Sequence, residues 1–315
     1  MVALPRAAVV GDLSQGQQRW LGRGRLSMRP PAALGLQRVL RHFGIEPPGA
    51  GLGALRLLGQ TGAAPSRWVA AADLVFLRAG MSRLRLHALG GDELNDEEAG
   101  LLLAAMRDLL LDDDDYELTC EGRFGYLHAV EPVFSASVSP EMIDGRTPDE
   151  HMPAGAAAAG YLRMLSEMQM CLHGHEINAR REAAGLRPAN SLWIWGGGTT
   201  PAAPTVTLPV LFANDPLTRG YWRNAAATNA AWREPAADLL ESAPAGFVAV
   251  MPDGRRAGTS VADVVDQFRQ LLRRRHISRL TLLFADGLSA EVERRHAWRF
   301  WRAGLPARPG DTFDD

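Results

Sequence analysis

Apolar residues follow a helical period over a long central stretch of the chain. From about Ala156 to Ala184 they recur at spacings of three and four, which is typical of one buried helix face. The pattern therefore predicts one long helix, with Gly185 as its C-terminal cap and Pro188 just beyond it. The apolar positions are Tyr161, Leu165, Met168 and Leu172.

The next segment changes to the period of a strand. Trp193 and Trp195 alternate with Leu192 and Ile194, so both indoles point to the same side of a strand over 191–195. We expect both tryptophans to be buried, because an inter-layer wall is the usual place for such a pair. The strand leads into Gly196-Gly197-Gly198, which we interpret as a turn.

Shorter elements are predicted on both sides of this region. Their alternation is typical of an α/β protein with mixed sheets and helices. Composition and pattern together divide the chain into a helical segment rich in Arg, Gly and Pro (1–66), a strand-helix-strand region (67–205) and a C-terminal α/β region (206–315). The predicted helices lie at about 32–43, 52–58, 94–111, 216–226, 235–241 and 263–275. The predicted strands lie at 73–78, 84–89, 116–120, 124–130, 206–212, 247–251, 279–285 and 290–294.

Charge and composition exclude several classes of function. All 34 basic residues are arginine, so lysine-based chemistry such as a pyridoxal Schiff base or a P-loop is excluded. The net charge of −2 favours neither a nucleic acid nor a membrane partner. Arg273 to His276 closes a predicted helix, where cations suit the negative end. With two distant cysteines and no apolar stretch of membrane-spanning length, we expect a cytoplasmic protein without a cofactor.

Polar side chains crowd into the segment from Glu167 to Gly198. Arg181 can offer a bidentate fork, Asn178 an amide donor, and the triple glycine unencumbered backbone N–H groups. His175 shares a helix face with Asn178, and Asn190 opens the strand. The alternative is a hydrogen-bonded cluster that ties the helix end to the strand. The candidate ligand-binding residues, without a metal, are His175, Asn178, Arg181, Asn190, Gly196, Gly197 and Gly198.

The same segment carries a resemblance to known families. Residues 175–198, HEINARREAAGLRPANSLWIWGGG, resemble the signature of the bacterial RpfE-type regulatory proteins. That family is itself similar to part of the archaeal-type cofactor-independent phosphoglycerate mutases. Residues 139–153, SPEMIDGRTPDEHMP, lie in the same order relative to the predicted elements as in those proteins. The resemblance implies a partial likeness to the alkaline-phosphatase-superfamily mutase fold. It also implies that the matching asparagine and arginine belong to a substrate-binding portion, which makes a phosphate or carboxylate the expected ligand.

The chain departs from the mutases where their metals bind. The resemblance requires a two-metal site near both chain ends, but only Asp12 follows the first apolar run, and Asp286-Gly287 is followed by Leu288 and Ser289 without a histidine. In-line phosphoryl transfer depends on such metals. We therefore expect a cytosolic RpfE-type regulatory protein that lacks mutase catalysis and binds a small anion. The alternatives are a metal-dependent mutase or phosphatase, and a protein-interaction module.

Overall fold

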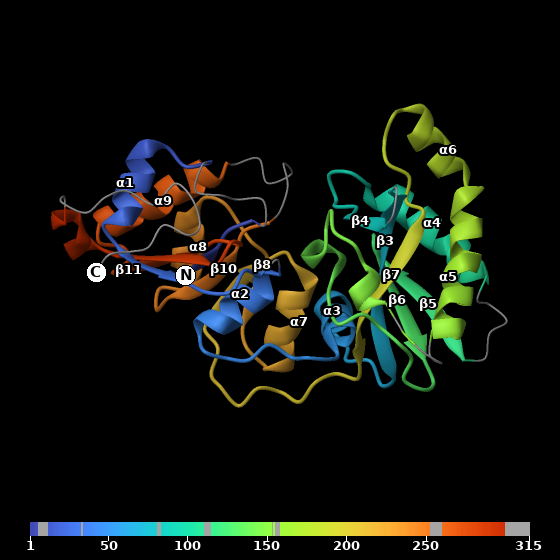
Figure 1. Ribbon diagram of the computed structural model, residues 1–315. Coiled ribbons are helices and arrows are strands. Elements are labelled where there is room, and N and C mark those ends of the chain that lie inside the picture. Colours follow the sequence, from blue (N-terminus) through green and yellow to red (C-terminus); the bar gives the residue numbers. More distant parts are fainter. Residues whose placement is uncertain are drawn as a thin grey trace. The chain divides into compact units, whose positions relative to one another are not determined.

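A computed structural model describes residues 1–5, 12–32, 34–80, 83–109, 115–152, 154, 158–252 and 260–299. The chain forms two compact units, one from residues 1–47 with 205–315 and the other from residues 48–204 (Figure 1). This division differs from the three consecutive segments expected from the sequence. The reason is that the first strand of the chain pairs with strands near its end, so the N-terminal segment is part of the C-terminal α/β unit.

The discontinuous unit is built on a seven-stranded mixed sheet, ordered β2-β12-β11-β1-β10-β8-β9. β1 lies between β10 and β11 and runs parallel to both. β11 and β12 form an antiparallel pair, and β2 is antiparallel to β12. The strands are β1 (Val2–Ala3), β2 (Arg25–Met28), β8 (Val210–Ala213), β9 (Asn229–Ala230), β10 (Phe247–Val250), β11 (Arg279–Leu283) and β12 (Leu288–Glu293).

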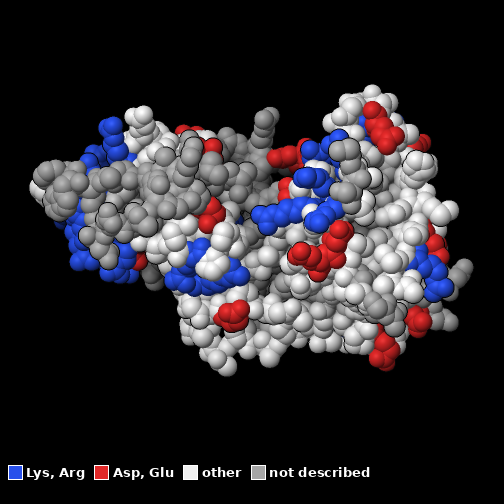
Figure 2. Space-filling view, in the orientation of Figure 1, with Lys and Arg blue, Asp and Glu red and all other residues white. Residues whose placement is uncertain are grey.

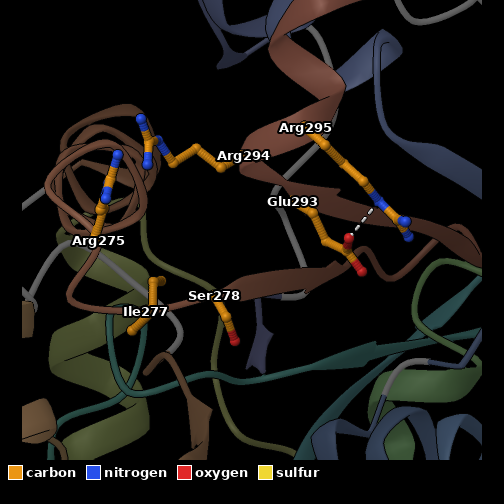
Figure 3. Close-up of a pocket in the computed structure, with 6 residues that line it drawn as sticks. All are labelled: Arg275, Ile277, Ser278, Glu293, Arg294 and Arg295. Carbon is orange, nitrogen blue, oxygen red and sulfur yellow. Dashed lines mark ion pairs between the residues drawn. The ribbon is translucent and has the colours of Figure 1, made fainter.

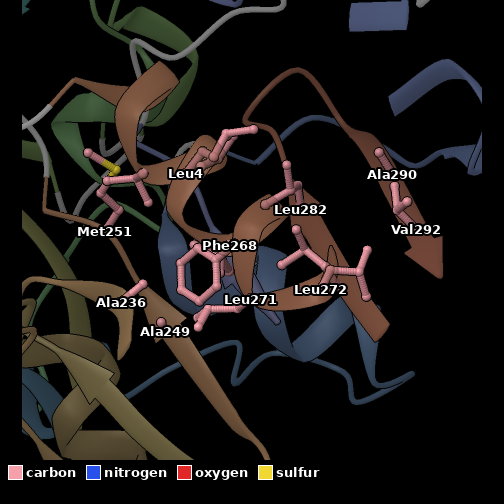
Figure 4. Close-up of a cluster of buried hydrophobic side chains, with 14 of the residues drawn as sticks. Leu4, Ala236, Ala249, Met251, Phe268, Leu271, Leu272, Leu282, Ala290 and Val292 are labelled. Atoms are coloured by element: carbon pink, nitrogen blue, oxygen red, sulfur yellow. The ribbon is translucent and has the colours of Figure 1, made fainter. Parts of the chain in front are cut away.

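Helices cover this sheet and close its core. Side chains from α9, among them Phe268 and Leu271, pack against sheet residues such as Ala249 and Leu282 (Figure 4). The N-terminus of α9 is fixed by a capping box between Ser260 and Asp263. The helices are α1 (Gln15–Gly22), α2 (Gly35–His42), α7 (Pro216–Asn224), α8 (Ala236–Ser242), α9 (Val261–Arg273) and the 3-10 helix η6 (Arg294–Trp298).

The contiguous unit is built on a five-stranded sheet around the long strand β3. β6 and β4 pair with successive halves of β3, and β7 pairs along its other edge; all three pairings are antiparallel. β5 and β6 form the predicted hairpin. The strands are β3 (Trp68–Ala79), β4 (Leu84–Ala88), β5 (Tyr116–Glu121), β6 (Phe124–Ala129) and β7 (Ser191–Gly198).

Alternation along β3 gives this sheet two different faces. Ala70, Ala72 and Leu74 belong to the core shared with α4 and α5, whereas Val69 packs with Leu57 of α3. Asp73 has the same parity as Val69 and therefore lies on the α3 face. The helices are α3 (Leu52–Thr61), α4 (Asp96–Leu109), α5 (Ala158–His173) and α6 (Glu176–Ala183), with short 3-10 turns η2 (Pro140–Met142) and η3 (Asp149–His151).

The structure confirms a mixed α/β fold and corrects two predicted elements. The long helix over 156–184 is two helices, α5 and α6, separated at Gly174 and His175. β7 continues through the triple glycine, which was interpreted as a turn. Both indoles of this strand are buried as expected, with Trp193 and Trp195 each 2% exposed. Among the described residues, no helix is long and apolar enough to span a membrane.

Candidate functional site

The corner where α5, α6 and β7 meet gathers the polar residues singled out in the sequence. α5 ends at His173, and His175 adopts the extended backbone of an N-cap residue for α6. The Nδ1 atom of His175 accepts the Ile177 N–H at 3.2 Å. A histidine is an unusual cap, but its ring nitrogen satisfies one of the unpaired N–H groups at the start of a helix. The imidazole therefore starts α6.

Asn178 connects three pieces of backbone at this corner. Its amide nitrogen donates to the carbonyl oxygens of Leu172 and Ala189, both at 2.8 Å. Its amide oxygen accepts the Ala189 N–H at 2.9 Å. The residue is 3% exposed, so these bonds replace water almost completely. The side chain thus ties the last turn of α5 to the segment that enters β7.

Arg181 is buried and bound by three protein acceptors. Its Nε donates to the Arg187 carbonyl at 2.9 Å, and one terminal nitrogen donates to the Glu93 carbonyl at 2.8 Å. The other terminal nitrogen lies 2.7 Å from Oε2 of Glu98 in an ion pair. The arginine side chain is 2% exposed and its partner carboxylate 29%. The guanidinium therefore joins α6 to the first turn of α4.

Asn190, just before β7, connects that strand to β3 through its side-chain amide. Its amide nitrogen donates to the Leu77 carbonyl at 2.9 Å, and its amide oxygen accepts the Leu77 N–H at 2.7 Å. The side chain thus mimics a strand neighbour and extends the ladder by one residue. Asn190 lies just before β7, whereas His175 caps the start of α6 and Asn178 and Arg181 lie within that helix.

The three glycines are required by close packing. A Cβ on Gly197 would lie 2.1 Å from a ring carbon of Trp68, and a Cβ on Gly198 would lie 2.7 Å from the Gly51 nitrogen. Gly196 also has a positive φ of 62°, which favours glycine. The Gly196 N–H donates to the Ala136 carbonyl at 2.8 Å, and the Gly197 N–H donates to the Ser135 hydroxyl at 3.0 Å. These two amides have protein acceptors.

The described contacts therefore match the alternative reading of this segment, a hydrogen-bonded cluster at the end of α6. We define the corner cluster as His175, Asn178, Arg181 and Asn190. Each of these side chains bonds to backbone or to a neighbouring carboxylate. A ligand-binding role for them stays a prediction from the sequence.

Sequence reasoning missed a buried ion pair on the opposite face of the sheet. Arg56 of α3 donates to both carboxylate oxygens of Asp73 at 2.7 and 2.9 Å, and to the Gly125 carbonyl at 2.9 Å. The Trp195 indole N–H donates to Asp73 Oδ2 at 2.7 Å. A signal was present, because both charged residues interrupt apolar runs, at 52–58 and 69–77. An unpaired charge is rarely buried, so the two predict each other.

Aromatic rings surround the Arg56 guanidinium. Its central carbon lies 4.8 Å from the ring centre of Tyr126, 4.9 Å from that of Phe124 and 5.6 Å from that of Trp195. Burial by itself would lower the pKa of Arg56, but the carboxylate of Asp73 raises it. Burial raises the pKa of Tyr126 to about 12. Arg56 therefore stays protonated inside this network, as a buried cation paired with the Asp73 carboxylate.

The residues expected at a two-metal centre do not converge in the described part of the chain. Among the residues that the structure describes, no three His, Cys, Asp or Glu side chains are placed to hold a metal ion. Asp12 is exposed. Asp286 Oδ1 accepts the Leu288 N–H at 3.0 Å in the turn between β11 and β12. These described residues do not fit the metal pair that the mutase resemblance implies.

On the face shown in Figure 2, the charged side chains of the described residues are divided among several small groups. In the view of Figure 2, arginines and acidic side chains form separate groups of both signs. This arrangement agrees with the net charge of −2. It leaves local clusters, rather than a global field, as the places where charge can select a ligand.

Comparisons with known proteins give a partial likeness. No protein-family model matches the chain. It is 33% identical over 129 residues to the 2,3-bisphosphoglycerate-independent phosphoglycerate mutase 2 of Methanothermobacter thermautotrophicus, covering 38% of this chain and 32% of that protein. It is 29% identical over 176 residues to the corresponding mutase of Methanosarcina mazei, covering 49% and 43%. The chain is similar to part of these mutases.

The chain spans less than half the length of these curated relatives in the matched regions. Among solved structures, the PH0037 protein from Pyrococcus horikoshii aligns over 95% of this chain and 91% of its own, with a TM-score of 0.51 and 14% identity. This likeness is one of fold. It agrees with the mixed α/β architecture described above.

Proposed function

We propose that this chain is a phosphoglycerate-mutase-like protein with a regulatory role and without mutase catalysis. The partial similarity to archaeal mutases supports the mutase-like part of the proposal. The resemblance of residues 175–198 to the RpfE-type proteins supports the regulatory part. The observation that supports the absence of catalysis is that Arg181 is buried and bound to three protein acceptors.

A phosphoryl-transfer site needs cationic donors that are free to meet the moving phosphoryl group. Arg181 is the arginine that the resemblance places in a substrate-binding portion, yet three protein acceptors hold it and its side chain is 2% exposed. A phosphate or carboxylate at this corner would have to take the guanidinium away from Glu98. We infer that the corner cluster serves the fold, and that the ancestral substrate arginine has become structural.

A mutase assay combined with metal analysis tests the proposal. The purified protein is incubated with 3-phosphoglycerate and Mn²⁺, Mg²⁺ or Co²⁺, and formation of the 2-phospho isomer is followed. The Methanosarcina mazei mutase serves as the positive control in the same buffers. We expect turnover only in the control and no stoichiometric metal retained by this protein. Metal-dependent turnover by this protein would overturn the proposal.

The second candidate is a metal-dependent phosphoglycerate mutase or phosphatase. One specific observation favours it: the curated relatives are named as mutases, and one is 33% identical over 129 residues. The same assay decides between the two, with a generic phosphatase substrate added to detect hydrolysis. Turnover that scales with bound metal supports the enzyme.

A further inference from the structure

An open pocket of about 330 Å³ lies where the hairpin of β11 and β12 meets the end of α9. This pocket belongs to the discontinuous α/β unit and is separate from the corner cluster. Its lining comes from residues just before β11, at the end of β12 and at the start of η6. The lining residues are Arg275, Ile277, Ser278, Glu293, Arg294 and Arg295 (Figure 3).

Some arginines at this end of the hairpin are neutralised by glutamates. Arg295 Nε lies 2.6 Å from Glu293, and Arg279 lies 3.0 Å from the same carboxylate. Burial would raise the pKa of Glu293, but Arg295 and Arg279 lower it, so the carboxylate stays ionised. The Glu293 carboxylate that lines the pocket is therefore already paired with Arg279 and Arg295.

Arg275 and Arg294 are in a different situation. Both are exposed, and within the described residues neither forms an ion pair with a carboxylate. Figure 3 shows their side chains extending toward one another, while Arg295 turns to Glu293. Two guanidinium groups that converge without a counter-ion repel each other. An anion placed between them would be attracted by both.

The backbone at Arg275 provides independent support for a function. The end of α9 is a Schellman motif, because the His276 N–H bonds to the Leu271 carbonyl and the Arg275 N–H to the Leu272 carbonyl. Arg275 occupies the left-handed position of this motif with φ 67°, where glycine is usual. A non-glycine residue there is strained, and such strain is often found at functional sites. The strained residue is also the one whose guanidinium lines the pocket.

We propose that a phosphate-type oxyanion binds in this pocket, held between the guanidinium groups of Arg275 and Arg294. Each arginine can donate two parallel N–H bonds to a phosphate group. The pocket is open to solvent, so the oxyanion can be the terminal group of a larger molecule. This proposal does not depend on the proposed function.

Calorimetric titration with inorganic phosphate tests this site. The ionic strength is held constant with chloride so that screening does not change. Arg275→Gln and Arg294→Gln remove one guanidinium each, and we expect either to weaken phosphate binding about tenfold or more. Arg274→Gln removes an exposed neighbouring charge that does not line the pocket, and we expect less than about a twofold change. No binding to the unmodified protein, or an equal loss in Arg274→Gln, would overturn the proposal.

Arg275→Gly provides a second test that separates binding from folding. Glycine relieves the strain at the left-handed position, so the variant is expected to unfold at a higher temperature than the unmodified protein. The same variant loses a phosphate donor and is expected to bind phosphate as weakly as Arg275→Gln. A stabilised variant with undiminished phosphate affinity would contradict the assignment of Arg275 to the site.

Discussion

At the scale of single residues, burial divides the ion pairs of this protein into two kinds. The side chains of Arg56 and Asp73 are 5% and 14% exposed, whereas those of Arg107 and Asp108 are 50% and 59% exposed. Exposed pairs contribute little because water already solvates both charges. A buried charge that loses its partner is left without either water or a counter-charge. The two pairs should therefore respond very differently to the same substitution.

Asp73→Asn removes the carboxylate charge and keeps the size of the side chain. We expect the free energy of unfolding to fall by about 3 kcal/mol, because Arg56 stays buried without its counter-ion. Asp108→Asn is the matched control at the exposed pair, with an expected change below about 0.5 kcal/mol. Urea unfolding followed by circular dichroism measures both. Equal effects of the two substitutions would show that burial of the Arg56 pair has no energetic consequence.

His296 gives the discontinuous unit a dependence on pH. Burial lowers the pKa of His296, and Arg299 and Arg295 lower it further. Its Nδ1 accepts the Glu293 N–H at 3.2 Å, which requires the neutral ring. The unfolded chain takes up the proton more readily, so this residue destabilises the fold as the pH falls through the ordinary histidine pKa of about 6.5.

The test compares the unfolding midpoint at about pH 7.5 and at about pH 5.5, on either side of that pKa. The unmodified protein should lose stability at the lower pH. His296→Gln, which keeps a hydrogen-bond acceptor but does not titrate, should lose less. An identical loss in both proteins would exclude His296 as a source of the pH dependence.

Residue chemistry was predictable from the sequence only in part. The alternation of Trp193 and Trp195 predicts their burial, because strand parity is local. The partners of Arg181 were not predictable, since Glu98 and the Glu93 carbonyl lie far away in the chain. From the sequence alone, a polar residue in a signature segment can therefore be interpreted either as a donor to a ligand or as a residue that stabilises the fold. Tertiary contacts decide between these two interpretations.

At the scale of elements, the triple glycine of β7 shows how one pattern can have two causes. Glycines in a row free the backbone N–H groups for an anion, and they also allow another chain segment to approach closely. Here a Cβ on Gly197 would collide with Trp68 and with the Ser135 hydroxyl. The glycines thus let β7 continue against neighbouring segments that would otherwise be displaced.

Gly197→Ala tests this role of the glycines. The added methyl would lie 2.1 Å from Trp68, so the indole or the strand must shift, and we expect a loss of about 2 kcal/mol or more in unfolding free energy. Gly174→Ala, between α5 and α6, is the control, because no atom lies within 4 Å of its Cβ position. The control should change stability by less than about 1 kcal/mol. A tolerated Gly197→Ala would mean that the close contact is not required.

The sequence predicted some elements well, but it missed a two-residue strand and a break in the longest predicted helix. The helix predicted over 94–111 is present as α4 (Asp96–Leu109), with residues 110–111 outside the described part of the chain, and the hairpin predicted over 116–130 is present as the β5–β6 pair. β1 has only two residues, too few to show a period. The break after α5 was missed because the apolar spacing runs up to Leu172 and the cap is a histidine.

At the scale of the whole molecule, connectivity separates the two units. Residues 48–204 form one continuous stretch with its own hydrophobic core. The other unit combines residues 1–47 with 205–315, and its central strand β1 comes from the first of these segments. A local sequence pattern does not predict this discontinuous unit, because the unit depends on strand pairing between the two ends of the sequence.

The two units should differ when they are produced as fragments. The fragment 48–204 contains every strand of its sheet, so we expect it to fold alone and to unfold cooperatively in urea. The fragment 205–315 lacks β1, which lies between β10 and β11, and we expect it to show no cooperative transition. Cooperative folding of 205–315 by itself, or its absence in 48–204, would contradict the division.

We infer that the corner cluster stabilises the fold in a segment that resembles part of a substrate-binding region. The most direct measurement is the unfolding free energy of Arg181→Gln beside that of Arg180→Gln. Arg180 is the adjacent arginine, whose pair with Glu176 is exposed. We expect a loss of about 3 kcal/mol for Arg181→Gln and less than about 0.5 kcal/mol for Arg180→Gln. An unchanged unfolding free energy for Arg181→Gln would show that Arg181 is not a structural residue.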